Sequence, residues 1–178
     1  MGSHVALAFD ALATAVDTVA GLAERQIARL TDERLNGGLP AFLHRGPAGL
    51  NGGFMGAQAS ATALVAEMRQ RAAPPSAQSL STNGANQDLV RMGAIAARAA
   101  AAQSEDASRV LAILALAAAQ GVDIVADGAD PAEDGFGPST AALYLWVRAR
   151  APAMPCDRPL SGEIEAVARE IAETPTPG

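Results

Sequence analysis

An almost unbroken apolar stripe occupies the first thirty residues of the chain. Its members recur at spacings of three and four, and they are Val5, Phe9, Leu12, Val16, Val19, Ala23, Ile27 and Leu30. This is the repeat of one face of an α-helix, so it predicts a single long helix over residues 5–30. A lone stripe cannot bury itself. The fold must therefore supply partner helices, from this chain or from another.

The rest of the chain is also patterned as helices, and no strand-like alternation of useful length appears. Apolar residues make up 49% of the 178 residues but aromatic residues only 3%. Alanine supplies much of the apolar share, and it favours helices that pack closely. Further helices are predicted at about 54–71, 88–103, 104–120, after Pro138, and at 161–173. We expect an all-α long-helix bundle, formed as one domain over residues 1–178, with 1–4 as a tag remnant and 174–178 as a flexible tail.

Composition excludes several classes of protein. The net charge is −6 and no lysine is present, so a basic nucleic-acid-binding surface is not expected. No uninterrupted apolar run reaches about 18 residues, which argues against a membrane-spanning helix. Cys156 is the only cysteine, so no intrachain disulfide or thiolate cluster can form. The start lacks the pattern of a signal peptide, and a cytoplasmic location is expected.

The segment 79–93 holds the most informative polar residues. It reads Ser-Leu-Ser-Thr-Asn-Gly-Ala-Asn-Gln-Asp-Leu-Val-Arg-Met-Gly and leads into an apolar helix. Side-chain amides such as those of Asn86 and Gln87 suit the recognition of a small polar substrate. An amide is neither a useful acid or base nor a nucleophile, so the segment predicts binding rather than covalent chemistry.

A complete catalytic or metal-binding set cannot be assembled from the remaining residues. His4 and His44 lack a metal-ligand companion, and Cys156 has no neighbouring histidine in the sequence. The acidic residues of the segment 121–138 do not have EF-hand spacing, so they predict a solvated loop rather than a calcium site. The two Asn-Gly-Gly triplets predict turns, because neither has the Lys-Ser/Thr pair of a phosphate-binding loop.

Several short motifs, taken in order, carry a resemblance to a known family. They are Glu24-Arg25-Gln26-Ile27, Leu39-Pro40-Ala41-Phe42-Leu43, Asn51-Gly52-Gly53-Phe54-Met55, Ser79-Leu80-Ser81-Thr82, Asn86-Gln87-Asp88, Met92-Gly93, Ala119-Gln120-Gly121 and Asp157-Arg158. This order resembles the C-terminal third of histidine and phenylalanine ammonia-lyases. The similarity extends over about residues 20–173.

The resemblance implies an enzyme of which this chain holds only a part. Members of the family are helical homotetramers that eliminate ammonia from an aromatic amino acid, or shift its amino group in the related aminomutases. Their electrophile is methylidene-imidazolone (MIO), formed from an internal Ala-Ser-Gly. This chain has no Ala-Ser-Gly, since Ala59-Ser60 is followed by Ala61 and Ala107-Ser108 by Arg109. It is therefore expected to be inactive alone, with no catalytic residue of its own.

The resemblance also assigns a role to the segment 79–93. In the family this loop ends near the substrate's amino group, with glutamate at the key place in histidine lyases and glutamine in phenylalanine and tyrosine enzymes. Counting back from Met92-Gly93 puts Gln87 there, with Asn86 beside it. Counting forward instead puts Asp88 there, at the cost of a one-residue gap. Gln87 is preferred, and Asn86 and Gln87 are the predicted substrate-binding residues. Their alternative role is to satisfy backbone groups of the loop.

Two main hypotheses of function follow, from different classes. In the first, the chain is the small subunit of a split aromatic ammonia-lyase or aminomutase, and a larger subunit supplies MIO, a tyrosine base and a carboxylate-binding arginine. In the second, it is a non-catalytic helical binding or scaffold protein descended from the lyase fold. A truncated form of a full-length lyase is a third possibility. Each implies a hetero- or homo-oligomer, and the long apolar stripe is consistent with a tetramer core.

Overall fold

The computed structural model describes residues 2–47, 49–126 and 136–173. Its elements, in order, are α1 (Ser3–Thr31), η1 (Ala41–Leu43), α2 (Met55–Gln70), η2 (Pro75–Ala77), α3 (Gly93–Ala126), α4 (Pro138–Arg148) and α5 (Ser161–Glu173). The described residues form no strand, and an isolated β-bridge joins Thr82 to Gln87. The all-α prediction is therefore confirmed. The predicted flexible tail, 174–178, lies outside the described residues.

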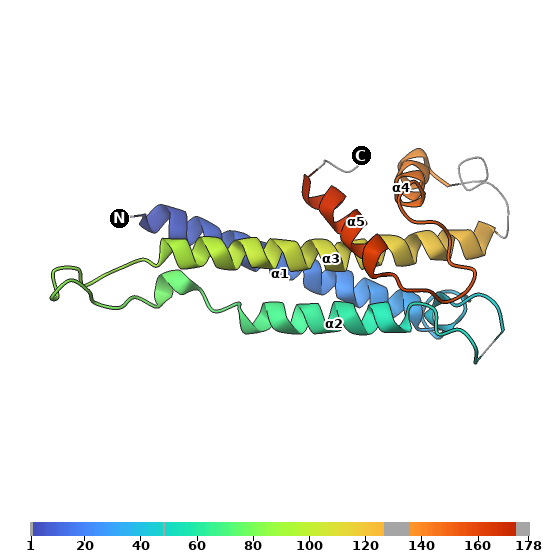
Figure 1. Ribbon diagram of the computed structural model, residues 1–178, viewed down its shortest axis with the longest axis horizontal. Helices are drawn as coiled ribbons and strands as arrows, with labels where there is room; N and C mark the ends of the chain where they lie inside the picture. Colours follow the sequence, from blue (N-terminus) through green and yellow to red (C-terminus); the bar gives the residue numbers. More distant parts are fainter. Residues whose placement is uncertain (1, 48, 127–135, 174–178) are drawn as a thin grey trace.

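Three long helices lie side by side in an elongated bundle (Figure 1). α1 and α3 run in the same direction and α2 runs against them, while α4 and α5 cover the C-terminal half of α3. Most of the buried apolar residues of α1 and α3 are alanines, among them Ala20, Ala23, Ala100 and Ala107. Small side chains allow the two helix axes to approach closely, as the composition predicted.

The prediction of two helices at 88–103 and 104–120 is wrong, because α3 is continuous over 34 residues. Ser104, the first residue of the second predicted helix, instead lies within α3 and donates to the carbonyl of Ala100 (2.9 Å). Asp106 is buried and pairs with Arg71 (2.8 Å) and Arg109 (3.0 Å). Gly121 does not end the helix. Contacts with the rest of the bundle thus override the local capping signals.

The start of α3 also differs from the prediction. Asp88 lies in the loop rather than in the first turn, since the helix begins at Gly93. Met92 has a φ of 49°, a left-handed conformation that a helix cannot contain. The loop before α3 is therefore longer than the sequence indicated, and it includes Asp88 and Arg91.

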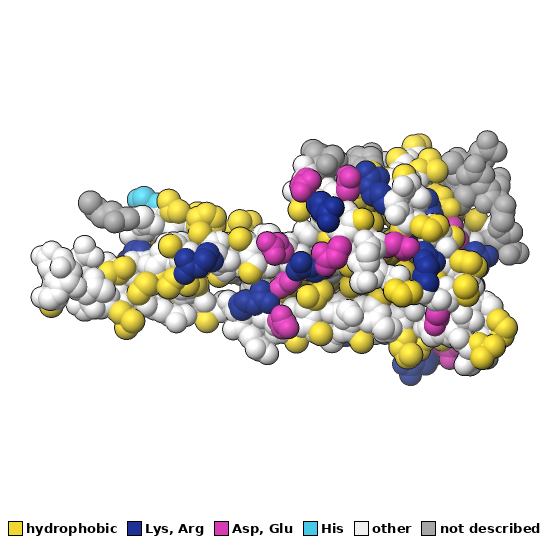
Figure 2. Space-filling model, in the orientation of Figure 1, with side chains coloured by type: hydrophobic (Ala, Val, Ile, Leu, Met, Phe, Trp, Pro, Cys, Tyr) yellow, Lys and Arg dark blue, Asp and Glu magenta, His cyan; other side chains and the backbone are white. Residues whose placement is uncertain are grey.

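The apolar stripe of α1 is only partly covered by this chain. Ala23 and Ile27 are buried, but Val5, Leu12 and Val19 remain 55%, 46% and 51% exposed. Figure 2 shows hydrophobic side chains gathered along the N-terminal half of this helix. The predicted helix is confirmed, whereas the N-terminal part of its stripe stays largely uncovered by the described residues.

A second stripe on α1 faces inward and is acidic. It consists of three residues at intervals of seven, Asp10, Asp17 and Glu24, and each accepts a hydrogen bond. The donors are the Ser76 N–H to Asp10 (3.2 Å), Gln103 Nε2 to Asp17 (3.2 Å) and Thr62 Oγ1 to Glu24 (2.8 Å). Glu24 is buried, with only 3% of its surface exposed. Arg25 binds the same carboxylate and holds the pKa of Glu24 below its usual range. These contacts fix the register of α1 against the following segments.

The acidic segment expected at 121–138 also divides differently. Asp123 belongs to α3, where it pairs with Arg148 (2.5 Å) and accepts from the Tyr144 hydroxyl (2.7 Å), so it joins α3 to α4. Burial, and next the Asp123 carboxylate, raise the pKa of Tyr144. The other acidic residues of that segment lie outside the described residues. Across the described ranges, no group of three potential metal ligands occurs.

Two helices, α1 and α3, are long and apolar enough to cross a membrane by length and composition alone. Both helices are rich in alanine and aliphatic residues, although polar residues interrupt their apolar runs. Half of the α3 window is buried in the bundle, as is usual for the core helix of a helical protein, against 11% of the α1 window. The absence of membrane contact stays a prediction.

The buried side chain of Gln120 connects α3 to two loops. Its Nε2 donates to the carbonyl oxygens of Met154 (2.9 Å) and Leu43 (3.4 Å), and its Oε1 accepts from the Met154 N–H (3.1 Å). We expect Gln120→Ala to lower the free energy of unfolding by about 2–4 kcal/mol, because it leaves buried backbone groups without partners. Urea denaturation of the purified chain measures this. The exposed Gln26→Ala is the control and should stay within about 0.5 kcal/mol; equal losses would contradict the assignment.

Asp17 should make stability depend on pH. Burial raises the pKa of its carboxyl above 3.8, more than the nearby Arg71 lowers it. Asp17 Oδ1 and Gln103 Oε1 are both buried without a donor among the described residues. The folded state binds the proton of Asp17 more tightly than the unfolded state does. The contribution of Asp17 to the free energy of unfolding is therefore fully present below the unfolded pKa of 3.8, and it is lost as pH rises through the raised pKa of the folded state.

We therefore expect Asp17→Asn to be more stable than the parent at pH 7, by about 1 kcal/mol, since its amide can donate where the carboxylate cannot. The difference should shrink towards acid pH in a series of thermal melts. Asp32→Asn is the opposite control. The hydrogen bonds from Arg34 lower the pKa of Asp32 to about 2, so its contribution is present at neutral pH and is lost only in strong acid. A constant gap between Asp17→Asn and the parent at every pH would refute the role of Asp17.

Candidate functional site

The loop 79–93 projects from one end of the bundle, at the same end as the start of α1 and away from α4 and α5 (Figure 1). Its position follows from the direction of the helices. α2 runs towards this end and stops before Pro74-Pro75, which cannot continue a helix. The chain must then turn back to begin α3. The loop is where this reversal occurs.

Two sets of hydrogen bonds hold the loop together. The Ser79 hydroxyl oxygen accepts from the Val90 N–H at 2.8 Å, which closes the base. Nearer the tip, Thr82 and Gln87 exchange backbone hydrogen bonds of 3.1 and 3.3 Å. The intervening turn has three consecutive residues with positive φ, Asn83 to Ala85, at 55°, 61° and 63°. Asparagine and glycine tolerate this conformation, which explains Asn83 and Gly84, whereas Ala85 adopts it against its intrinsic preference.

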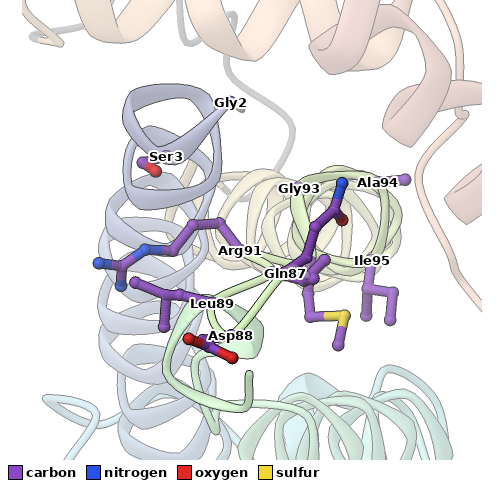
Figure 3. A pocket seen from close by; sticks show the side chains of 11 residues that line it. Gly2, Ser3, Gln87, Asp88, Leu89, Arg91, Gly93, Ala94 and Ile95 are labelled. Carbon is purple, nitrogen blue, oxygen red and sulfur yellow. The ribbon is translucent and has the colours of Figure 1, made fainter. Parts of the chain in front are cut away.

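A hollow of about 620 Å³ lies where the loop meets the starts of α1 and α3. It is lined by Gly2, Ser3 and the residues 87–95. Figure 3 shows the Gln87 side chain extending over α3, whereas the Arg91 side chain extends across α1. Amide, carboxylate and guanidinium groups thus line one small cavity, a combination suited to a small polar molecule.

The two predicted substrate-binding residues, Asn86 and Gln87, lie in different positions relative to the hollow. Both are exposed, but Gln87 lines the hollow and Asn86 lies in the turn beyond it. Asp88, the residue that the other way of counting selects, lines the hollow as well. The Gln87 side chain makes one long contact, accepting from Thr82 Oγ1 at 3.5 Å, so it contributes little to backbone hydrogen bonding in the loop. Its side chain is available to a ligand.

Sequence reasoning missed Arg91 as a residue of this site. Its side chain lines the hollow, and its Nε is buried without a hydrogen-bond partner among the described residues. The signal in the sequence was a single basic residue in an otherwise uncharged stretch after Asp88. It could not be used, because the loop was predicted to be helical from Asp88 onward.

The remaining candidates are not brought together. His4 lies exposed on α1, Cys156 is exposed, and His44 is half-buried with a buried Nδ1 that has no partner among the described residues. No catalytic set of nucleophile and base appears in the described part of the chain.

The second Asn-Gly-Gly triplet, residues 51–53, binds the carboxylate of Asp157 from the same chain. Asp157 accepts from the backbone N–H groups of Gly52 (2.6 Å) and Gly53 (3.0 Å), and its own N–H donates to the side chain of Asn51 (3.0 Å). A Cβ on Gly53 would lie 2.4 Å from the carbonyl oxygen of Phe42, so only glycine fits there. The turn interpretation is confirmed, and the turn joins two motifs that the sequence had linked only by order.

Comparison with known proteins gives the family. The family model for aromatic amino acid lyases matches residues 1–149. The chain is 55% identical to the tyrosine ammonia-lyase of Cereibacter sphaeroides over 173 residues, which is 97% of this chain and 32% of that protein. It is 44% identical to the MIO-dependent tyrosine 2,3-aminomutase of Streptomyces globisporus over 171 residues, 96% of this chain and 31% of that protein.

The solved structures agree. The crystal structure of the tyrosine aminomutase from Streptomyces globisporus superimposes with a TM-score of 0.89 at 44% identity, over 96% of this chain and 31% of that one. The chain therefore belongs to the aromatic amino acid lyase family. It spans about a third of the length of the curated relatives that it matches.

The base of the loop gives a direct test of its structure. Ser79→Ala removes the acceptor of the Val90 N–H, and we expect amide hydrogen exchange at residues 82–90 to become about five to ten times faster, as for the loss of about 1 kcal/mol. The thermal midpoint of the bundle should change little. Ser81→Ala is the matched control, since Ser81 is exposed and its hydroxyl has no partner in the described ranges. Unchanged exchange in Ser79→Ala would show that the 2.8 Å contact does not hold the loop.

Proposed function

We propose that this chain forms one wall of the active site of a split aromatic ammonia-lyase or aminomutase, completed by a larger chain. The observation that carries the proposal is the hollow at the tip of the bundle, where Gln87 is free to contact a ligand. The family and the reactions named for its relatives support the type of chemistry. In the proposed complex, Gln87 orients the amino group of the substrate by hydrogen bonds, and Asn86 supports the neighbouring surface.

The cofactor of such an enzyme would have to come from the larger chain. This sequence has no Ala-Ser-Gly, so it cannot form MIO itself. MIO supplies an electrophile when it is present, and the larger chain would also supply the base and a carboxylate-binding arginine. The residues of the hollow suit a neighbouring role, because an amide can donate and accept hydrogen bonds without competing as a nucleophile. This chain's contribution is to bind, orient and enclose the substrate.

Gln87 favours an aromatic amino acid of the phenylalanine or tyrosine type. A neutral amide at this place matches the pattern of phenylalanine and tyrosine enzymes, whereas histidine lyases carry glutamate. The names of the relatives in Cereibacter sphaeroides and Streptomyces globisporus agree with a tyrosine-like substrate. Elimination and amino-group shift both fit this wall, since both begin from the same bound amino acid.

The exposed stripe on α1 supports an oligomer. Val5, Leu12 and Val19 lie at helical spacing and about half of each side chain is exposed, as expected for a helix that packs against another chain. We place the complex in the cytoplasm, with a tetrameric helical core. The same surface would serve the alternative functions, either a non-catalytic scaffold that forms a homo-oligomer or a truncated form of a full-length lyase.

Co-expression with a larger chain tests the proposal. The partner is the tyrosine ammonia-lyase of Cereibacter sphaeroides, shortened by the third that this chain matches. The shortened partner is first checked for an intact Ala-Ser-Gly. We expect a complex that converts tyrosine or phenylalanine to a cinnamate-type product, measured by ultraviolet absorbance. No complex and no product, together with a stable homo-oligomer of this chain alone, would favour the scaffold.

Gln87 variants test the substrate assignment in that complex. Gln87→Glu should lower kcat/KM for tyrosine by about 10- to 100-fold, because it places a charge where a neutral amide contacts the substrate. Gln78→Glu makes the same change on an exposed residue outside the hollow and should leave kcat/KM within about two-fold. Equal losses of kcat/KM in both variants would show that Gln87 does not contact the substrate.

A further inference from the structure

Arg91 is a charged residue without a partner in a partly enclosed place. Its side chain is half-buried, its Nε is buried, and it makes no hydrogen bond or ion pair with any residue that the structure describes. Seven other arginines form ion pairs with carboxylates of this chain; they are Arg25, Arg34, Arg71, Arg109, Arg148, Arg150 and Arg158. The buried Nε thus lacks an acceptor among the described residues, and an anionic ligand in the hollow could supply one to the guanidinium.

The surroundings of Arg91 also favour an anion. The hollow is bounded by the first residues of α1 and of α3, helices of 29 and 34 residues that run in the same direction. The N-terminal N–H groups of α3 carry partial positive charge, which adds to that of the guanidinium. Asp88 opposes this effect, but it is exposed and forms no ion pair with Arg91. Separated positive and negative groups in one cavity match a molecule that carries both charges.

We propose that Arg91 binds the carboxylate of the amino-acid substrate in this hollow. The inference rests on the proposed function and deepens it. Arg91 would add a cation from this chain to the arginine that we assign to the larger chain, with each carboxylate oxygen free to accept from a different guanidinium. Gln87 and Asp88 also line the cavity, and we assign the substrate's ammonium group to them.

A different occupant would be an acidic side chain of a neighbouring subunit. Such a contact would also neutralise Arg91, but it would not depend on a free amino acid. The two cases differ in what they predict for the purified chain. A substrate site discriminates between small molecules with and without a carboxylate, whereas a subunit contact does not.

The test uses two compounds that differ in the carboxylate, L-phenylalanine and 2-phenylethylamine. Each is titrated into the purified 178-residue chain, and the NMR signals of the backbone amides at residues 87–95 are followed. We expect L-phenylalanine to shift these signals and to bind about 10- to 100-fold more tightly than 2-phenylethylamine, the range for a hydrogen-bonded charge pair. Arg91→Gln should abolish this difference and Arg91→Lys should retain part of it. Arg98→Gln, the same change on the next arginine along the chain, should have no effect.

Three outcomes overturn the assignment. These are equal binding of both compounds, shifts confined to residues outside 87–95, and a preference for L-phenylalanine that survives in Arg91→Gln. The amide spectrum shows whether Arg91→Gln folds, and if it does not, Arg91→Lys is the deciding variant. A carboxylate site requires Arg91→Lys to bind L-phenylalanine more weakly than the parent does. The variant must still bind L-phenylalanine more tightly than 2-phenylethylamine. The result is independent of turnover. Product formation in the complex with no role for Arg91 would reject this inference alone, and a carboxylate preference without product formation would reject the split-enzyme proposal alone.

Discussion

The parallel packing of α1 against α3 is the constraint on which the rest of the structure depends. Because both helices begin at the same end of the bundle, the chain must return to that end through α2 before α3 can start. The return places the loop 79–93 beside the first turn of α1, and the hollow forms where these three parts meet. The candidate site is thus a consequence of helix direction, and the alanines between the two helices are what permit so close a pairing.

Polar contacts fix this arrangement more specifically than apolar burial could. The acidic stripe on α1 matches donors on the returning segment and on α3, and Gln120 holds the loops at the opposite end. Alanine-rich surfaces are nearly uniform along a helix, so they allow several registers of similar energy. Buried hydrogen bonds have partners in only one register, because a shifted helix would leave carboxylates and amides unsatisfied.

The chain presents a partial site and a partly covered helix, and these two features belong together. The hollow has binding groups but no catalytic set among the described residues, and the α1 stripe is exposed along the same end of the molecule. A family in which this region is about a third of each relative gives both features one explanation.

The sequence by itself determined the helical class, the extents of α1, α2 and α5, and the family, since long periodic stripes and ordered motifs are local properties. It also singled out the segment 79–93 and Gln87. Tertiary structure alone decided that α3 is unbroken through Ser104 and Gly121, that Glu24 is buried, and that Arg91 lines the hollow. The physical reason is the same in each case. A capping residue or a charge takes its role from the partners that packing brings to it, and those partners lie tens of residues away in the chain.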